Sequence, residues 1–238
     1  MSLKLLETKK LHYGEYLYKL TMSNPLAPIF RSSSQRGGIL THTKVVLDDL
    51  TRKYREGEPL KKITYRASID ITEAAYLDAK DIYSVLKKST NYKLCCKAGT
   101  VLGLYSNDRD MLVKLSKKMR TSLREFWEPR PEAVEILKTK EHLVISNNPL
   151  GFEYQLHLSW KAVDLGFYTW AVANGDKVRI GPKTLKAFQR GYANGSYIYV
   201  RDDRVLTLVE LLIGHAMRKV DKIVYTGDID KYKYDIEQ

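Results

Sequence analysis

The five histidines are the first residues to test for catalysis, because imidazole serves both acid–base chemistry and metal binding. They lie far apart in the sequence, at His12, His42, His142, His157 and His215. No pair has the His-x-His spacing of a rolling-circle nickase or the His-Glu-x-x-His spacing of a zinc hydrolase, and no glycine-rich phosphate loop follows an expected strand. The motifs therefore indicate neither of these metal-dependent chemistries nor nucleotide hydrolysis.

Three carboxylates have positions that suit a metal ion: Asp70, Asp202 and Asp203. Asp70 lies on an expected first strand, as a metal ligand of a polymerase or cyclase palm does, but the expected hairpin 96–101 contains no Asp or Glu. Asp202 and Asp203 follow an expected strand, where either one is also the expected N-cap of a helix. We predict no catalytic residue, metal or cofactor, and the sequence leaves open whether these three aspartates bind a metal.

The only two cysteines, Cys95 and Cys96, are adjacent on an expected strand. Neighbouring residues of a strand point to opposite faces, so a disulfide between them would be strained, and two thiols alone are too few ligands for a metal. We expect free thiols and a reducing, cytoplasmic location. No stretch approaches the roughly 18 to 20 apolar residues that cross a bilayer, so we expect no membrane partner.

The charge of the chain is its strongest functional signal. Lysine and arginine number 40 against 28 aspartates and glutamates, which leaves a net charge of +12 and an isoelectric point near 9.5. Half of this excess lies in residues 1–62. Such a balance favours a polyanionic partner before any motif is considered.

Lysines and arginines on four expected elements are the candidate nucleic-acid contacts. They belong to a Pro/Ser-rich loop at 23–38, a helix at 43–55, a helix at 108–126, and a strand with a following helix at 177–190. In chain order they are Arg31, Arg36, Arg52, Lys53, Lys114, Lys117, Lys118, Arg124, Arg179, Lys183, Lys186 and Arg190. The simpler interpretation of each of these faces is a solvated surface. The cations of 43–55 also lie near the C-terminal end of their helix, where they interact favourably with the helix dipole.

The pattern of apolar residues predicts an α+β protein in three parts. Residues 1–62 form a basic N-terminal extension of strand, flexible loop and short helix. Residues 63–147 read strand 63–71, helix 73–88, strands 92–97 and 100–105, helix 108–126 and strand 142–146, which is the βαββαβ order called ferredoxin-like. Residues 148–238 form a second small α+β unit of strands 152–159, 177–180 and 196–200 with helices 163–173 and 182–190, and it ends in a long amphipathic helix at 203–225.

A ferredoxin-like sheet binds RNA in some proteins by stacking bases on aromatic residues of its central strands. The expected third strand carries only Tyr105, without the basic-glycine-aromatic pattern of that use, and Tyr65 on the first strand is the one candidate for a second platform. The simpler expectation is that Tyr65 and Tyr105 pack under the second domain.

We therefore predict a non-catalytic protein that binds nucleic acid, DNA or RNA, mainly through its phosphates. One alternative is a structural or assembly subunit, for example of a viral particle or another complex, whose basic faces meet acidic protein surfaces and whose proline-rich arm docks on a neighbour. Its partner is then another protein or a second copy of the chain. Another is a metal-dependent nuclease built on scattered carboxylates. Absorbance at 260 and 280 nm after purification in low and high salt separates the first two readings.

Overall fold

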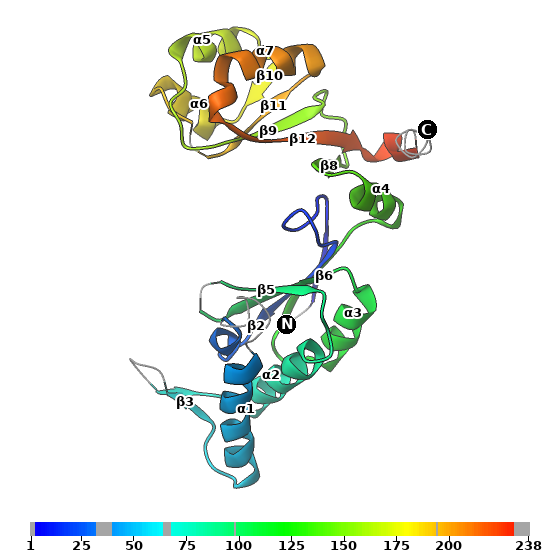
Figure 1. Cartoon of the computed structure of the whole chain (residues 1–238), viewed down its shortest axis with the longest axis vertical. Coiled ribbons are helices and arrows are strands. Elements are labelled where there is room, and N and C mark those ends of the chain that lie inside the picture. The colour runs from blue at the N-terminus through cyan, green and yellow to red at the C-terminus, as the bar shows by residue number, and fades with distance from the viewer. Residues whose placement is uncertain (1–2, 32–39, 64–67, 98, 194, 231–238) are drawn as a thin grey trace. The chain divides into compact units, whose positions relative to one another are not determined.

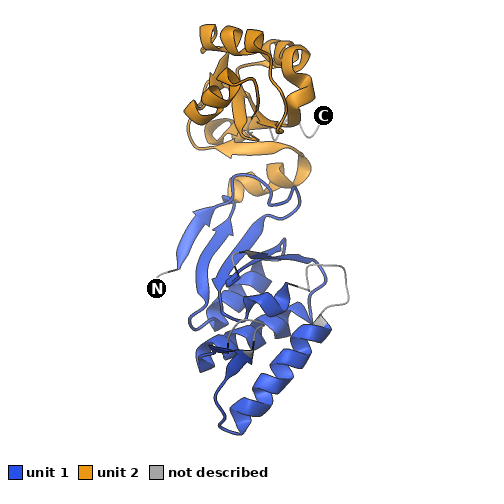
Figure 2. Ribbon diagram, turned by 90° about the vertical axis from the view of Figure 1, so that its left-hand side faces the viewer, with its two compact units in different colours: residues 1–130 blue, residues 131–238 orange. Residues whose placement is uncertain are grey.

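In a computed structural model, the chain folds into two compact units, residues 1–130 and 131–238 (Figure 2). The structure describes residues 3–31, 40–63, 68–97, 99–193 and 195–230. Both units combine a five-stranded sheet with helices, so the expected α+β class is confirmed. The units end elsewhere than the expected segments 1–62, 63–147 and 148–238, because strands from the N-terminal and the middle segment share one sheet.

Unit 1 is built on a sheet with the order β1-β7-β2-β6-β5. Its strands are β1 (Lys4–Glu7), β2 (Tyr18–Ser23), β5 (Tyr92–Lys97), β6 (Val101–Ser106) and β7 (Leu123–Glu128). Neighbouring strands are antiparallel except β1, which runs parallel to β7. In chain order, β2, β5, β6 and β7 occur with helices between β2 and β5 and between β6 and β7.

The core of unit 1 lies between this sheet and its helices (Figure 1). The helices are α1 (Leu40–Arg55), α2 (Glu73–Leu86) and α3 (Arg109–Lys118), with the short 3-10 helix η1 at Ala27–Phe30. Leu20 and Met22 of β2 are fully buried against Ala79 and Ile82 of α2 and Leu112 of α3 in one apolar cluster. Thr72 caps α2 as expected, because its side chain accepts a hydrogen bond from Ala75 N–H.

The strand that lies between β6 and β7 in this sheet is β2, and not the expected strand 63–71. That segment contributes to a separate two-stranded sheet, β3 (Lys61–Ile63) with β4 (Ser68–Asp70), and residues 64–67, including Tyr65, lie outside the described residues. All three residues of β4 are exposed, whereas β2 alternates buried and half-buried positions. The alternation of apolar residues that a sheet core requires is thus stronger in β2.

The expected helix 108–126 is wrong in its second half, which forms β7. The apolar spacing of Leu115, Met119 and Leu123 continues past the end of α3 at Lys118, but the chain turns there. Asp78 of α2 is fully buried and accepts backbone N–H bonds from Arg120 at 2.8 Å and Ser122 at 2.9 Å, and a third from Thr121 at 3.1 Å. This carboxylate fixes the turn, and a contact 42 residues away leaves no signal in local periodicity.

Unit 2 has a sheet with the order β10-β11-β9-β12-β8. Its strands are β8 (Leu143–Ser146), β9 (Tyr154–Leu158), β10 (Val178–Ile180), β11 (Tyr197–Val200) and β12 (Met217–Tyr225). Its helices are α4 (Val134–Thr139), α5 (Leu165–Ala173), α6 (Pro182–Gln189) and α7 (Asp203–Ile213). β8 was expected in the sheet of the preceding unit, but it pairs in parallel with β12.

The expected long helix 203–225 is wrong beyond Ile213. α7 ends at Ile213, and after a 3-10 turn at Gly214–Ala216 the chain forms β12, a strand between β9 and β8. Pairing on both sides with β9 and β8 outweighs the helical spacing of Ala216, Val220 and Ile223. Among the described residues, no helix is long and apolar enough to span a membrane.

Candidate nucleic-acid interface

One face of the unit 2 sheet lies opposite its main helices. Leu156 of β9 and Ile198 and Val200 of β11 are buried in the cluster that contains Phe167 of α5 and Phe188 of α6. Side chains alternate between the faces of a strand, so the residues between these point the other way. The opposite face therefore carries His157 of β9 with Tyr197 and Tyr199 of β11.

Four aromatic rings follow one another along this face. The ring centroids of Phe152 and Tyr199 are 6.3 Å apart, those of Tyr199 and Tyr197 are 5.4 Å apart, and those of Tyr197 and His157 are 6.1 Å apart. Tyr197 is 46% exposed. We call Phe152, Tyr199, Tyr197 and His157 the ring row; it crosses from β11 to β9, where Tyr197 pairs with His157.

Two of the sequence-predicted cations meet this row at its β10 side. Arg179 of β10 pairs with Tyr199 in the strand register, and Lys183 lies in the first turn of α6. Both line a cavity of about 660 Å³ together with Tyr197, Tyr199 and Leu150. Cavities of roughly 300 to 1,000 Å³ hold small-molecule ligands in proteins. The structure thus brings a cationic pair and two tyrosines to one concave surface.

The N-terminus of α6 opens onto the same cavity. Its cap is Gly181, whose lack of a side chain leaves the first turn without a side-chain cap, and Gly181, Pro182 and Thr184 all line the cavity. The first turn has no acidic residue. The helix dipole and the N–H groups of this turn add to the positive potential that Arg179 and Lys183 create.

Tyr199 keeps its proton at neutral pH. Burial raises the pKa of its phenol, the neighbouring Tyr197 raises it further, and Arg179 opposes the change. A protonated phenol donates one hydrogen bond and also offers an aromatic face. Tyr199 is therefore suited to contact a base or a phosphate without bringing a negative charge to the cavity.

His157 at the far end of the ring row is held by a buried carboxylate. Its Nε2 lies 2.8 Å from Oδ2 of Asp221, a fully buried residue of β12. Lys219 Nζ lies 2.6 Å from the other oxygen of Asp221, which balances the charge of the carboxylate. The ring of His157 is thus fixed in orientation.

The other predicted cations of units 1 and 2 are scattered. Lys186 and Arg190 are exposed on or just after α6, as predicted. Lys114, Lys117 and Lys118 are exposed on α3, and no ion pair is recorded for them within the described part of the chain. Arg124 was expected on that helix but lies half-buried on β7, because the helix ends earlier. Arg31 is exposed after η1, and Arg36 lies outside the described residues.

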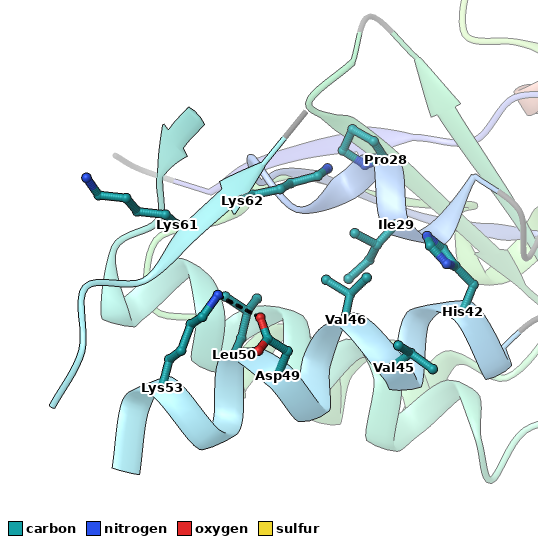
Figure 3. A pocket seen from close by; sticks show the side chains of 10 residues that line it. All are labelled: Pro28, Ile29, His42, Val45, Val46, Asp49, Leu50, Lys53, Lys61 and Lys62. Atoms are coloured by element: carbon teal, nitrogen blue, oxygen red, sulfur yellow. Dashed lines mark ion pairs between the residues drawn. The ribbon is translucent and has the colours of Figure 1, made fainter. Parts of the chain in front are cut away.

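The cations of α1 are compensated by acidic neighbours. Arg52 pairs with Asp49 at 3.3 Å and also with Glu56, while Lys53 Nζ lies 2.8 Å from Asp49. Lys53 also lines a cavity of about 390 Å³ beside the apolar Ile29 and Val46, where its ammonium group reaches Asp49 (Figure 3). Surface pairs of this kind contribute little to stability, but they reduce the charge available to a polyanion.

The three candidate metal aspartates lie in ordinary structural positions. Asp202 caps α7 by accepting a hydrogen bond from Val205 N–H at 3.0 Å, and this bond together with Arg201 lowers the pKa of its carboxyl. Asp203 accepts a hydrogen bond from the Tyr154 hydroxyl, and Asp70 is exposed beside Lys61. The described residues contain no cluster of three or more His, Cys, Asp or Glu side chains suited to a metal.

Unit 1 has a comparable aromatic face, of which only Tyr105 was identified from the sequence. Trp127 of β7, Lys19 of β2 and Tyr105 of β6 lie side by side in the strand register. His12 covers them, with its ring 5.4 Å from Tyr105 and 5.9 Å from Trp127, and the Tyr13 ring lies 4.9 Å from Tyr105. Tyr105 is therefore buried under the β1–β2 connection of its own unit.

Comparison with known protein families, curated proteins and solved structures finds no match to this chain.

Proposed function

We propose that the protein binds nucleic acid, and that the cavity beside α6 is its principal contact site. The observation that carries this proposal is the meeting of Arg179 and Lys183 with Tyr197 and Tyr199 at one concave surface. In the +12 chain, these cations sit next to a helix N-terminus without a side-chain cap. Guanidinium, ammonium and helix N–H groups are the usual partners of phosphate oxygens.

Binding at this site is expected to be salt-dependent and weakly selective for sequence. Contacts to phosphates release condensed counterions, so affinity falls steeply as salt rises, and such contacts carry no direct information about bases. Lys186 and Arg190 extend the same charged surface along α6 and act with Lys183. The role proposed for the protein is therefore that of a binding protein rather than an enzyme.

Two finer features of the protein belong to the same proposal. We propose that residues 18–128 have the ferredoxin-like arrangement, with β2 as its first strand; the sheet order β7-β2-β6-β5 and the positions of α2 and α3 in the chain support it. We also propose the cytoplasm as the location, because Cys95 and Cys96 are both free thiols.

A salt series of filter-binding measurements tests the proposed function. Replacing Lys183, Lys186 and Arg190 together by Ala should flatten the slope of log K against log salt by roughly 2 to 3, at about 0.7 to 0.9 for each lost phosphate contact. The matched control is Lys87→Ala with Lys88→Ala, which removes exposed lysines after α2 and should change the slope little. Wild-type affinity weaker than about millimolar at low salt, for single strand and duplex alike, would discard the proposal.

A second candidate function is self-assembly, and the outer face of α7 favours it. Leu208, Leu211 and Leu212 lie on one side of this helix and are exposed, Leu211 to 80%. Exposed apolar side chains at helical spacing are typical of contact surfaces. Light scattering at high micromolar concentration should then show a dimer or larger species that Leu211→Gln disrupts; a monomeric wild type would exclude this candidate.

A further inference from the structure

We infer that the ligand of the α6 cavity is single-stranded nucleic acid, whose bases stack on Tyr197 and Tyr199 while Arg179 and Lys183 hold its backbone. This inference rests on the proposed function and deepens it, since phosphate contacts alone would accept a duplex equally well. The two tyrosines are the residues that would select a single strand over a duplex.

Aromatic rings are accessible at the site. Tyr197 is close to half exposed, and Tyr199 lies beside it at the cavity wall. The two ring planes are inclined by 70°, so the rings do not stack face to face on each other. The exposed ring of Tyr197 thus offers a platform for a planar group, and base–aromatic stacking tolerates every base because each has a π-face.

Only one form of nucleic acid presents free base faces to such rings. In a duplex the faces of the bases are stacked on one another, whereas an unpaired strand exposes them to protein side chains. A site with phosphate-binding cations alone would not distinguish the two forms. A site that adds tyrosines to the cations favours the unpaired strand, because only that strand satisfies both sets of contacts.

Positive charge is unevenly placed along the ring row. Arg179 and Lys183 lie at the Tyr199 side of the row, and Lys219 lies at the other side, where it pairs with His157 in the register of β12 and β9. Lys219 is compensated by Asp221 at 2.6 Å, so the positive charge available to a ligand lies at the Tyr199 side of the row. Asp221 holds the His157 ring at 2.8 Å, so the end of the row is fixed before the ligand arrives. Such preorganisation reduces the entropic cost of binding.

Fluorescence anisotropy with labelled oligonucleotides tests the inference. The probes are a mixed-sequence strand of about 12 nucleotides, as DNA and as RNA, each alone and annealed to its complement. The variants are Tyr197→Ala with Tyr199→Ala, the same pair changed to Phe, and the single change Tyr197→Ala, which affects an exposed side chain and so preserves the fold. Tyr54→Ala is the matched control, because Tyr54 is 41% exposed on α1 in unit 1.

The expected result is tighter binding of the single strands, with affinity lost by about 5- to 150-fold in Tyr197→Ala, by more in the double Ala variant, and retained in the Phe variant. The DNA and RNA arms then show whether the sugar affects affinity. Equal loss in the Ala and Phe variants would overturn stacking, as would a wild type that prefers the duplex. Unchanged single-strand affinity in the Ala variants, with weaker binding after Lys183→Ala, would overturn this inference but leave the proposed function intact. No binding of any probe by the wild type would overturn both.

Discussion

Each unit carries aromatic and cationic side chains together on one face of its sheet. This face is covered in unit 1 and accessible in unit 2. In unit 1, Trp127, Lys19 and Tyr105 are covered by His12 and Tyr13, and Lys19 Nζ lies 4.8 Å from the centre of the Trp127 ring. In unit 2, Tyr197 is exposed and Arg179 lines an open cavity. In unit 1 the aromatic rings and the lysine contact one another, whereas in unit 2 the aromatic rings and the cations are accessible to a ligand.

The difference comes from the connection between two neighbouring elements. In unit 1, the residues between β1 and β2 fold back over the sheet. Two backbone hydrogen bonds join His12 and Tyr16, each residue donating one, and Tyr13 has a positive φ of 58°. In unit 2, the short connection from β10 to α6 leaves the face beside β11 open. By residue composition, both faces are thus candidate ligand sites. Only the path of a connecting segment decides which of them is open to a ligand.

The largest expected effect is the loss of the carboxylate that positions β7, the strand of Trp127. Asp78→Ala removes the acceptor of the backbone N–H groups of Arg120, Thr121 and Ser122 and should destabilise unit 1 by about 3 kcal/mol. Urea unfolding followed by far-ultraviolet circular dichroism measures it. The control is Asp81→Ala, which removes a partly exposed partner of Arg120 and should cost less than about 1 kcal/mol.

This prediction also has a pH dependence. Burial by itself would raise the pKa of Asp78, but the three N–H bonds and Ser122 hold it below its usual value of 3.8. A lowered carboxyl pKa stabilises the folded state fully above pH 3.8, and the contribution is lost as the pH falls through the folded pKa. If the wild type and Asp78→Ala unfolded at the same urea concentration near neutral pH, the role assigned to this carboxylate would be wrong.

A smaller effect separates the open face from the covered one. Changing Arg179 and Lys183 to Met should lower the slope of log K against log salt by about 1.4 to 1.8, because two phosphate contacts are lost. The same change at Lys19 and Lys93, whose ammonium groups lie over Trp127 and Tyr13, should leave the slope unchanged. Equal slopes in the two double variants would remove the distinction between the faces.

At neutral pH the smallest effect concerns the residues that cover the unit 1 face, because this effect develops only below about pH 6.5. Burial, and to a lesser extent Lys19, lowers the pKa of His12 from 6.5 to about 4. Between about pH 6.5 and 4, His12 is protonated in the unfolded chain and neutral in the folded chain. The free energy of unfolding of unit 1 should therefore fall as the pH drops from about 6.5 to 4. His12→Phe, which keeps a ring over Tyr105 and Trp127, should weaken this dependence; urea titrations at several pH values check it.

Much of unit 2 could be predicted from the sequence. The strands β9, β10 and β11 and the helices α5 and α6 lie within two residues of their expected bounds. Two of the errors fall where a helical spacing of apolar residues continues into a strand, after Lys118 and after Ile213. There, a buried carboxylate from α2 or pairing with distant strands decides the structure, and a local pattern records neither.

The candidate site was predictable in part. Arg179 and Lys183 were identified by charge, but the tyrosines that join them were not, although Tyr197 and Tyr199 alternate with Ile198 on an expected strand. That alternation indicates a face shared by two tyrosines. It does not show whether the face is open, and Tyr105, which is covered by His12 and Tyr13, shows how much depends on that difference.

Photochemical cross-linking tests the central claim most directly. The full chain is irradiated with a bromodeoxyuridine-substituted single strand at low salt, and the cross-linked peptides are identified by mass spectrometry. The account predicts cross-links on the β11 peptide that contains Tyr197 and Tyr199, and their loss at high salt. Cross-links confined to residues 1–130, or a β11 peptide that stays free while the strand is bound, would contradict it.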